Sequence, residues 1–258
     1  MNKLKKALIN NEVTFGTWVQ IPHPSIIEII AYNSGSKLDW ICIDMEHGVI
    51  DIESMTNLIR TIEKFDIVPI VRIPKNDYIW IHRVLDAGAK GLIIPMVKTA
   101  DEARDVVKEA LYPPLGQRSF GYSRANVYGK DFDNYVRTAN EEISIVIQIE
   151  HIEAINNLDF ILDVKGINAT FIGPYDLSGS IGLPGDFERD EYQNALKFYI
   201  SQSLELSVIK GIHIVRPTDE KIKFAVNTGY KMVAIGTDAV FLEEKCKNIF
   251  GESVGEIK

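Results

Sequence analysis

The sequence contains few cysteines, no long hydrophobic run and no excess of basic residues. Its two cysteines, Cys42 and Cys246, lie far apart, which argues against a disulfide framework and favours a reduced, cytoplasmic protein. No apolar run approaches the ~18 residues of a transmembrane helix, and no apolar segment follows the basic start, so we expect neither a membrane span nor a signal peptide. The formal net charge of -8 argues against binding to nucleic acids or anionic membranes.

The chain also lacks linkers, low-complexity tracts, internal repeats and a G-x-G-x-x-G motif after its first predicted strand. With 258 residues, 46% of them hydrophobic, it can form a sizeable core, and we expect one domain over residues 1–258. The missing glycine motif disfavours a dinucleotide-binding open sheet.

Short segments rich in Ile and Val, apolar on both faces, alternate with amphipathic segments, as in a parallel sheet covered by helices. The predicted strands are 14–20, 40–45, 67–73, 91–97, 144–150, 169–173, 211–215 and 232–236. The predicted helices are 24–33, 52–64, 77–87, 100–111, 152–164, 190–206, 218–228 and 239–250. This count predicts an α/β protein with a (β/α)8 TIM barrel; a doubly wound open sheet, which usually has fewer strands, is the alternative.

Polar side chains follow the predicted strands at their carboxyl ends, where such a barrel forms its active site. The second strand is the clearest case, because its apolar run ends in Asp44, Glu46 and His47. The residues at the other strand ends are Trp18, Gln20, Arg72, Lys98, Gln148, Glu150 and Asp176.

Glu150 and Asp176 are the candidate metal ligands. Two carboxylates from adjacent strands suit Mg²⁺ or Mn²⁺, which bind oxygen and leave positions for water and substrate. Gln148 shares a strand face with Glu150, and a polar residue in that apolar run needs a partner. The alternative for either acid is a helix N-cap or a surface ion pair.

His47 is the candidate base, because an imidazole with its unperturbed pKa of ~6.5 accepts a proton near neutrality; capping is the alternative. Arg72 would bind a carboxylate or stabilise an enolate, unless it forms a structural ion pair with Asp44 or Glu46. Asp86 is a candidate to support His47, in competition with Asp44, which lies nearer in sequence. A solvent-facing acid at a helix end is the alternative for Asp86.

A carboxylate-held metal, an imidazole and an arginine together fit the chemistry of a 2-oxo acid that chelates the metal. The metal would polarise the ketone, Arg72 would stabilise the developing enolate and a base would move the proton. That reaction is aldol cleavage or its reverse. His151 directly follows Glu150, a position from which it could reach the metal, and we expect His213 to be a hydrogen-bonded interior residue. Two loops, 112–130 and 176–188, are expected to be functional.

Six segments, in order along residues 15–241, resemble the HpcH/HpaI aldolases. They are Trp40-x-x-x-Asp44-x-Glu46-His47-Gly48, Pro69-x-Val71-Arg72, Leu85-Asp86-Ala87-Gly88-Ala89-x-Gly91, Tyr112-Pro113-Pro114-x-Gly116-x-Arg118, Gln148-x-Glu150 and Gly173-Pro174-x-Asp176-Leu177-Ser178. This resemblance implies a class II, metal-dependent pyruvate aldolase for a 4-hydroxy-2-oxo acid, such as 4-hydroxy-2-oxoheptanedioate or a 2-keto-3-deoxy sugar acid. The products would be pyruvate and an aldehyde.

The resemblance also implies a role for each site residue. Glu150 and Asp176 would bind a divalent ion, Mg²⁺, Mn²⁺ or Co²⁺. His47 would accept the proton, with Asp86 raising its basicity, and Arg72 would stabilise the transition state.

For the substrate, the resemblance implies contacts from Gln148 and from the backbone amides of Tyr175 and Asp176, which would hold the pyruvyl carboxylate. It further implies a homohexamer, a trimer of dimers in which neighbours exchange a C-terminal helix. His151 and the segment 20–24 depart from the family pattern, so the aldehyde partner stays open.

Three other functions remain as alternatives. A Schiff-base aldolase would need a desolvated lysine, for which Lys98 is the best placed. A citrate-lyase-like enzyme would act on a CoA thioester, although no basic patch for the CoA phosphates is evident. A catalytically silent barrel would bind pyruvate without turning over an oxo acid.

Overall fold

Eight short apolar segments pair in parallel, in chain order, and close into a barrel in the computed structural model, which describes residues 1–253. The strands are β1 (Thr14–Val19), β2 (Trp40–Asp44), β3 (Val68–Arg72), β4 (Gly91–Ile94), β5 (Ser144–Ile149), β6 (Ala169–Ile172), β7 (Lys210–Ile214) and β8 (Met232–Thr237). This arrangement confirms the predicted (β/α)8 barrel and excludes the open sheet. Residues 254–258, included in the predicted domain, lie outside the described residues.

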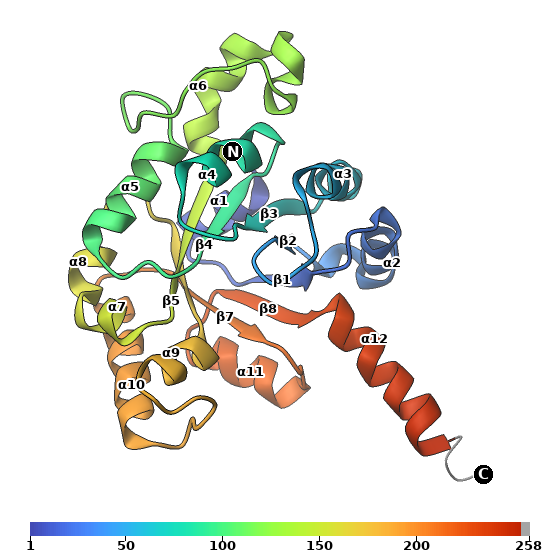
Figure 1. Cartoon of the computed structure of the whole chain (residues 1–258), viewed down its shortest axis with the longest axis vertical. Coiled ribbons are helices and arrows are strands. Elements are labelled where there is room, and N and C mark those ends of the chain that lie inside the picture. Colours follow the sequence, from blue (N-terminus) through green and yellow to red (C-terminus); the bar gives the residue numbers. More distant parts are fainter. Residues whose placement is uncertain (254–258) are drawn as a thin grey trace.

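The helices surround the barrel, as Figure 1 shows. They are α1 (Lys3–Ile9), α2 (Pro24–Ser34), α3 (Ile52–Ile62), α4 (Tyr78–Asp86), α5 (Ala100–Ala110), α6 (Phe132–Glu142), α7 (Ile152–Asn156), α8 (Leu158–Leu162), α9 (Pro174–Ser180), α10 (Asp190–Glu205), α11 (Asp219–Asn227) and α12 (Asp238–Cys246). Shorter helical turns are η1 (Gly35–Lys37), η2 (Arg124–Gly129) and η3 (Lys247–Ser253).

Four helical features differ from the sequence prediction. The sequence indicated no helix at α1 or α6, and the predicted helix 152–164 is broken at Asn157 into α7 and α8. The predicted loop 176–188 begins inside α9, where Pro174 fits the first turn because it has no N–H to leave unpaired. Helices α1, α7, α8 and α9 have only five to seven residues, too few turns for a clear apolar stripe, whereas α6 is as long as α3 and follows a predicted loop.

Side chains inside the barrel form one apolar cluster, separate from the larger cluster between barrel and helices. Trp40 fills part of the interior, and a Cβ at position 16 would lie 2.1 Å from its ring, so only Gly16 fits there. Helix α1 adds Leu4 and Leu8 to the same interior cluster. These two leucines are spaced by one helical turn, which puts both on one face of α1.

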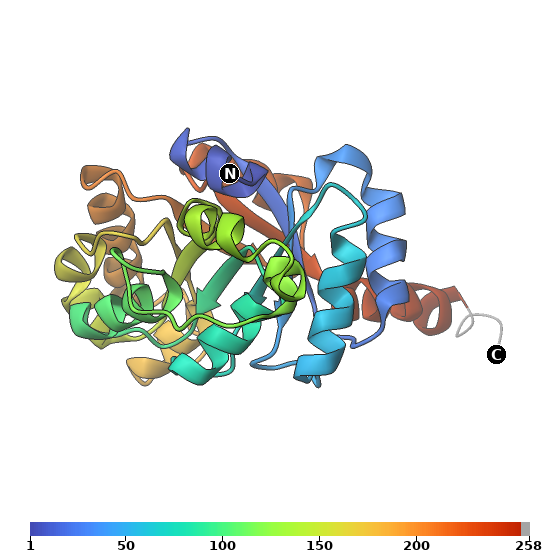
Figure 2. The same ribbon diagram turned by 90° about the horizontal axis from the view of Figure 1, so that it is seen from above.

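Helix α12 extends away from the barrel in both Figure 1 and Figure 2. Its side chains Phe241 and Leu242 are 37% and 58% exposed. Cys42 is buried, Cys246 is exposed, and the two form no disulfide with each other. None of the helices in the described part of the chain has the length and hydrophobicity needed to cross a membrane.

Candidate active site

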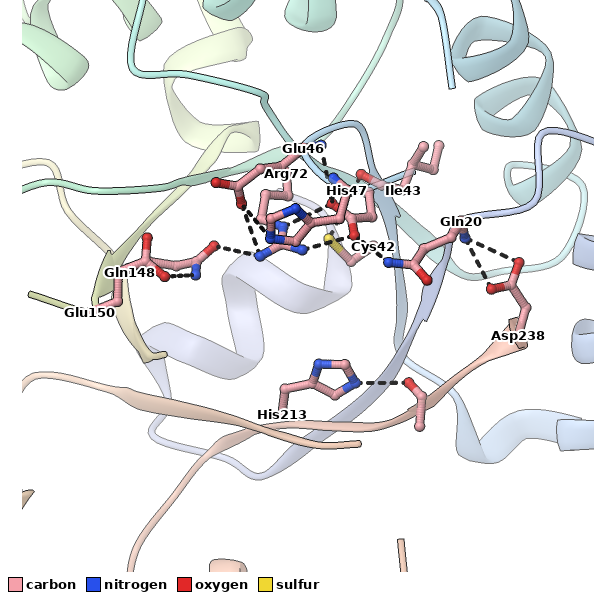
Figure 3. A network of polar contacts seen from close by, with 12 residues as sticks. Gln20, Cys42, Ile43, Glu46, His47, Arg72, Gln148, Glu150, His213 and Asp238 are labelled. Atoms are coloured by element: carbon pink, nitrogen blue, oxygen red, sulfur yellow. Dashed lines mark hydrogen bonds and ion pairs between the residues drawn. The ribbon is translucent and has the colours of Figure 1, made fainter. Parts of the chain in front are cut away.

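A cleft of about 1030 Å³ opens at the carboxyl ends of the strands. The structure brings together residues from the ends of every strand except β4, whose predicted strand-end residue Lys98 lines a separate hollow. The polar and aromatic lining residues at the barrel mouth are Trp18, Gln20, His47, Arg72, Gln148, Asp176 and His213. Figure 3 shows Arg72 at the centre, with Glu46, His47 and Gln148 around it.

Asp44 fixes the orientation of Arg72 at the ends of β2 and β3, which pair in register at these two residues. Nε and one terminal nitrogen of Arg72 donate to the two carboxylate oxygens over 2.9 and 2.8 Å, a bidentate ion pair. Burial alone would raise the pKa of Asp44, but hydrogen bonds and charge from Arg72 outweigh it and lower that pKa. The structural ion pair weighed as an alternative role for Arg72 is therefore formed.

The third nitrogen of Arg72, NH1, is not used by Asp44. It lies 3.0 Å from Oε2 of Glu46 and donates over 3.4 Å to Oε1 of Gln148. The guanidinium also packs 4.2 Å from the ring of Trp18. Arg72 lines the cleft, so NH1 is the part of this side chain that a substrate oxygen can reach.

Glu150 follows β5 and is almost fully buried, with 2% of its surface exposed. Its Oε1 accepts from the backbone N–H of Met96 over 2.7 Å, and its Oε2 accepts from Nε2 of Gln148 over 2.5 Å. A Cβ at Gly173 would lie 2.6 Å from Oε2, so the glycine lets β6 approach the carboxylate. Burial raises the pKa of Glu150 to about 7, and repulsion from Glu46 adds to the shift.

Asp176 is the exposed member of this acidic cluster, in the first turn of α9. Within residues 1–253 its carboxylate has neither a hydrogen bond nor an ion pair, although its charge raises the pKa of both Glu46 and Glu150. The three carboxylates are therefore close enough to repel one another. Buried acids in excess of cations are the donor set that a hard divalent cation requires.

A complete cage for a metal ion is not formed by protein groups alone, since no three His, Cys, Asp or Glu side chains of residues 1–253 are arranged to ligate one. Glu150 and Asp176 fit a cation whose remaining positions are taken by water or substrate oxygens, as is usual for Mg²⁺. His151 does not join them, because its Nδ1 accepts from the backbone N–H of Glu153 over 3.1 Å and caps α7. That His151 lies near the metal stays a prediction.

His47 lies in the turn after β2, and its side chain is 60% exposed to the cleft. Nε2 is 3.9 Å from Oε2 of Glu46, and the backbone N–H donates to Oδ1 of Asp44 over 3.3 Å. Asp44 therefore fixes the backbone of this turn, while the imidazole has only the long contact with Glu46 and is exposed to the cleft. This arrangement suits a group that exchanges a proton with a bound substrate.

Asp86 is not brought to His47 within one subunit. It ends α4, which runs antiparallel to the strands, so it lies toward the end of the barrel opposite the cleft. Its Oδ1 accepts from Arg118 over 2.6 Å, and Arg118 is fully buried against the rings of Tyr112 and Tyr135. The catalytic role of Asp86 stays a prediction.

The predicted substrate contacts come from one side chain, Gln148, and from two backbone amides. Gln148 is 4% exposed and bridges Arg72 to Glu150, so the need for partners inferred from its apolar run is confirmed. The backbone amides of Tyr175 and Asp176 lie in the first turn of α9, where no preceding helical carbonyl can accept from them. The ring of Tyr175 is 65% exposed.

Sequence reasoning missed two residues at the ends of β7 and β8. His213, expected to be a hydrogen-bonded interior residue, does contact the carbonyl of Gly236 over 3.0 Å, but it also lines the cleft. The buried carboxylate of Asp238 accepts the backbone N–H groups of Gln20 and Ile21 and so positions the turn after β1. Both residues follow the same rule of polar groups at strand ends, applied to the last two strands.

Known proteins resemble this chain over almost its whole length. The HpcH/HpaI aldolase/citrate lyase family matches residues 14–243. A 2-keto-3-deoxy-L-rhamnonate aldolase from Salmonella dublin is 36% identical, covering 94% of this chain and 90% of that protein. A 4-hydroxy-2-oxo-heptane-1,7-dioate aldolase from Escherichia coli is 33% identical, covering 100% and 98%.

Solved structures agree in fold. The crystal structure of an HpcH/HpaI aldolase/citrate lyase family protein from Burkholderia cenocepacia J2315 superposes with a TM-score of 0.91 at 27% identity. The match covers 98% of this chain and 99% of that one. The protein described here therefore belongs to the HpcH/HpaI aldolase/citrate lyase family.

Proposed function

We propose that the protein is a divalent-metal-dependent aldolase that reversibly cleaves a 4-hydroxy-2-oxo acid to pyruvate and an aldehyde. The chain is a carbon–carbon lyase, in keeping with the aldolases that share a third of its sequence. The observation that supports the metal-dependent reaction best is that Asp176 shares one cleft with Arg72 and His47, while the buried Glu150 lies close enough to Asp176 for the two charges to repel.

Glu150 and Asp176 would hold the cation, Mg²⁺, Mn²⁺ or Co²⁺. When bound, it supplies Lewis-acid polarisation of the 2-oxo group. The backbone amides of Tyr175 and Asp176 would bind the substrate carboxylate, and Gln148 would orient the oxo acid.

The chain's own groups would then move the proton and stabilise the charge. The imidazole of His47 takes the proton of the 4-hydroxyl, the C3–C4 bond breaks, and its electron pair forms the enolate of pyruvate. NH1 of Arg72 donates to the developing enolate oxygen, while Asp44 keeps the guanidinium in place. Proton return to C3 completes pyruvate, and the C4 fragment leaves as the aldehyde.

The Schiff-base alternative lacks a suitable lysine at the barrel mouth. Lys98 lines a separate hollow, together with Glu102 and Asp105, rather than the main cleft. In the main cleft, the ammonium of Lys221 donates to the carbonyl of Arg216 over 3.2 Å. Neither lysine is desolvated within the barrel, as a Schiff-base nucleophile needs to be.

The proposed assembly is a homohexamer that exchanges its C-terminal helix between neighbours, in the cytoplasm. The extension of α12 away from its own barrel, with Phe241 and Leu242 exposed, supports the exchange. The two unpaired cysteines support a reducing compartment.

Chelation tests the proposal most directly. We expect exhaustive treatment with EDTA to abolish pyruvate release from a panel of 4-hydroxy-2-oxo acids, because the ketone is then no longer polarised. Adding Mg²⁺, Mn²⁺ or Co²⁺ should restore it, measured through the coupled oxidation of NADH by lactate dehydrogenase. Pyruvate release that survives complete metal removal would exclude the metal-dependent reaction.

A further inference from the structure

The ring of His213 is held in one orientation on the wall of the cleft. It stacks on Trp18, with ring centroids 5.0 Å apart and an interplanar angle of 4°, and Nε2 lies 3.0 Å from the carbonyl oxygen of Gly236. Burial lowers the pKa of His213 to about 4, so the ring is neutral at physiological pH. Because a carbonyl only accepts, Nε2 holds the proton and Nδ1 is left as an acceptor.

No residue in the described range 1–253 donates to that Nδ1, and Figure 3 shows it without a contact. Nδ1 is not fully enclosed by protein, and because His213 lines the cleft, this atom is open to it. A fixed, neutral acceptor of this kind is complementary to a donor such as a hydroxyl group.

Gln20 presents a second fixed acceptor in the same cleft. Its Nε2 donates to Oδ2 of Asp44 over 2.8 Å, and its backbone N–H donates to Asp238 over 3.0 Å. The amide cannot rotate without placing its oxygen against the Asp44 carboxylate, so Oε1 is turned away from Asp44 (Figure 3). Within residues 1–253 this oxygen has no donor.

Acidic side chains outnumber basic ones in the outer part of the cleft. Arg216 lies 2.8 Å from Glu243 and 3.0 Å from Glu244, and Lys221 donates to a backbone carbonyl. Glu220 also lines this part, beside apolar side chains such as Phe224. Lys221 is the one cation here that has no acidic partner among residues 1–253, so a substrate carboxylate would lose water beside a net negative set of side chains.

We propose that His213 and Gln20 form a hydroxyl-accepting subsite, which selects a neutral hydroxyaldehyde over an aldehyde that ends in a carboxylate. This subsite rests on the proposed aldolase function and specifies its aldehyde half. A hydroxyl of the aldehyde chain donates its single hydrogen to one of these two acceptors, and the other can accept from a second hydroxyl on a longer chain. The paired Arg216 and the acidic side chains of the outer cleft disfavour a dicarboxylic substrate.

The test compares aldehydes that differ by one group, in the addition of pyruvate by the metal-loaded protein. We expect kcat/KM for lactaldehyde to exceed that for propionaldehyde by ~10-fold or more. Propionaldehyde lacks the hydroxyl, so it leaves the acceptor atoms of the site without a hydrogen-bond donor. Butyraldehyde should be used better than succinic semialdehyde. In His213→Phe, which keeps an aromatic ring on Trp18, the lactaldehyde-to-propionaldehyde ratio should fall at least ~5-fold.

Two further variants and one aldehyde-free assay complete the design. Gln20→Met should lower the same ratio, whereas His82→Phe, outside the cleft, should keep the wild-type ratio. An unchanged ratio in both cleft variants, or a preference for succinic semialdehyde, overturns the subsite. Exchange of the pyruvate methyl protons in D2O needs no aldehyde, so its absence would overturn the aldolase function itself.

Discussion

Asp44 and Glu150 are both buried carboxylates at strand ends, yet their surroundings shift their pKa values in opposite directions. Asp44 has a bidentate partner in Arg72, and its pKa is lowered. Glu150 accepts only from an amide and a backbone N–H, faces other acids, and has its pKa raised to about 7. Arg72 therefore neutralises Asp44 at the ends of β2 and β3, whereas Glu150 and Asp176, which follow β5 and β6, have no basic partner among residues 1–253 and would be balanced by a cation.

Removing the guanidinium of Arg72 should have the largest effect. We expect Arg72→Ala to lower kcat by at least ~100-fold, the scale of a lost oxyanion donor. It should also lower the melting temperature, because Asp44 is left buried without its partner. Both are measured on the metal-loaded protein, by pyruvate release and by thermal unfolding.

Arg72→Lys is the matched control, since it keeps the charge but cannot form the bidentate pair. We expect its activity and melting temperature to lie between those of wild type and Arg72→Ala. A drop in kcat of under about threefold for Arg72→Ala, less than ~1 kcal/mol of barrier, would exclude the proposed role.

His47 belongs to neither side of the comparison, because its imidazole is exposed and only its backbone is fixed by Asp44. His47→Ala should therefore lower kcat by ~100-fold, as for a lost general base, with little change in melting temperature. The same coupled assay and a thermal melt measure the two quantities. A variant that unfolds early, or one that keeps near-normal kcat, would contradict this separation of catalysis from folding.

Much of the fold was predictable because a buried parallel strand leaves a simple pattern of apolar residues. The exception at β4 is instructive: it ends at Ile94, not at the predicted position 97. The apolar run continues, but Met96 takes a positive φ of 56° and turns its N–H toward Glu150. Hydrophobic periodicity does not record a turn imposed by a buried acid on another strand.

The sequence predicted residues of the candidate site but not which acid pairs with the arginine. The strand-end rule identified Arg72, Glu150 and Asp176, but both acids of the opening comparison look alike in sequence. Which acid receives the arginine depends on the register of β2 against β3, where Asp44 faces Arg72. Asp86 ends α4, away from the cleft of its own subunit, so its proposed support of His47 stays a prediction.

The smallest expected effect concerns the ionisation of Glu150 in the metal-free protein. The pKa of Glu150 rises from 4.5 to about 7, mainly by burial, so the folded chain binds a proton that the unfolded chain has released. Stability of the metal-free protein should therefore fall as pH rises through this window. We expect the melting temperature of wild type to drop by several degrees relative to Glu150→Gln between pH 5 and pH 7.5, roughly a few kcal/mol.

Mn²⁺ should reverse this trend, because a carboxylate binds a cation only when it is deprotonated. Its stabilising effect should be larger at pH 7.5 than at pH 5 in wild type, and largely lost in Glu150→Gln. Thermal melts of the two proteins at both pH values, with and without Mn²⁺, measure the effect. Parallel pH profiles for the two proteins would mean that Glu150 is ionised like Asp44, and the contrast between the two sides of the cleft would then disappear.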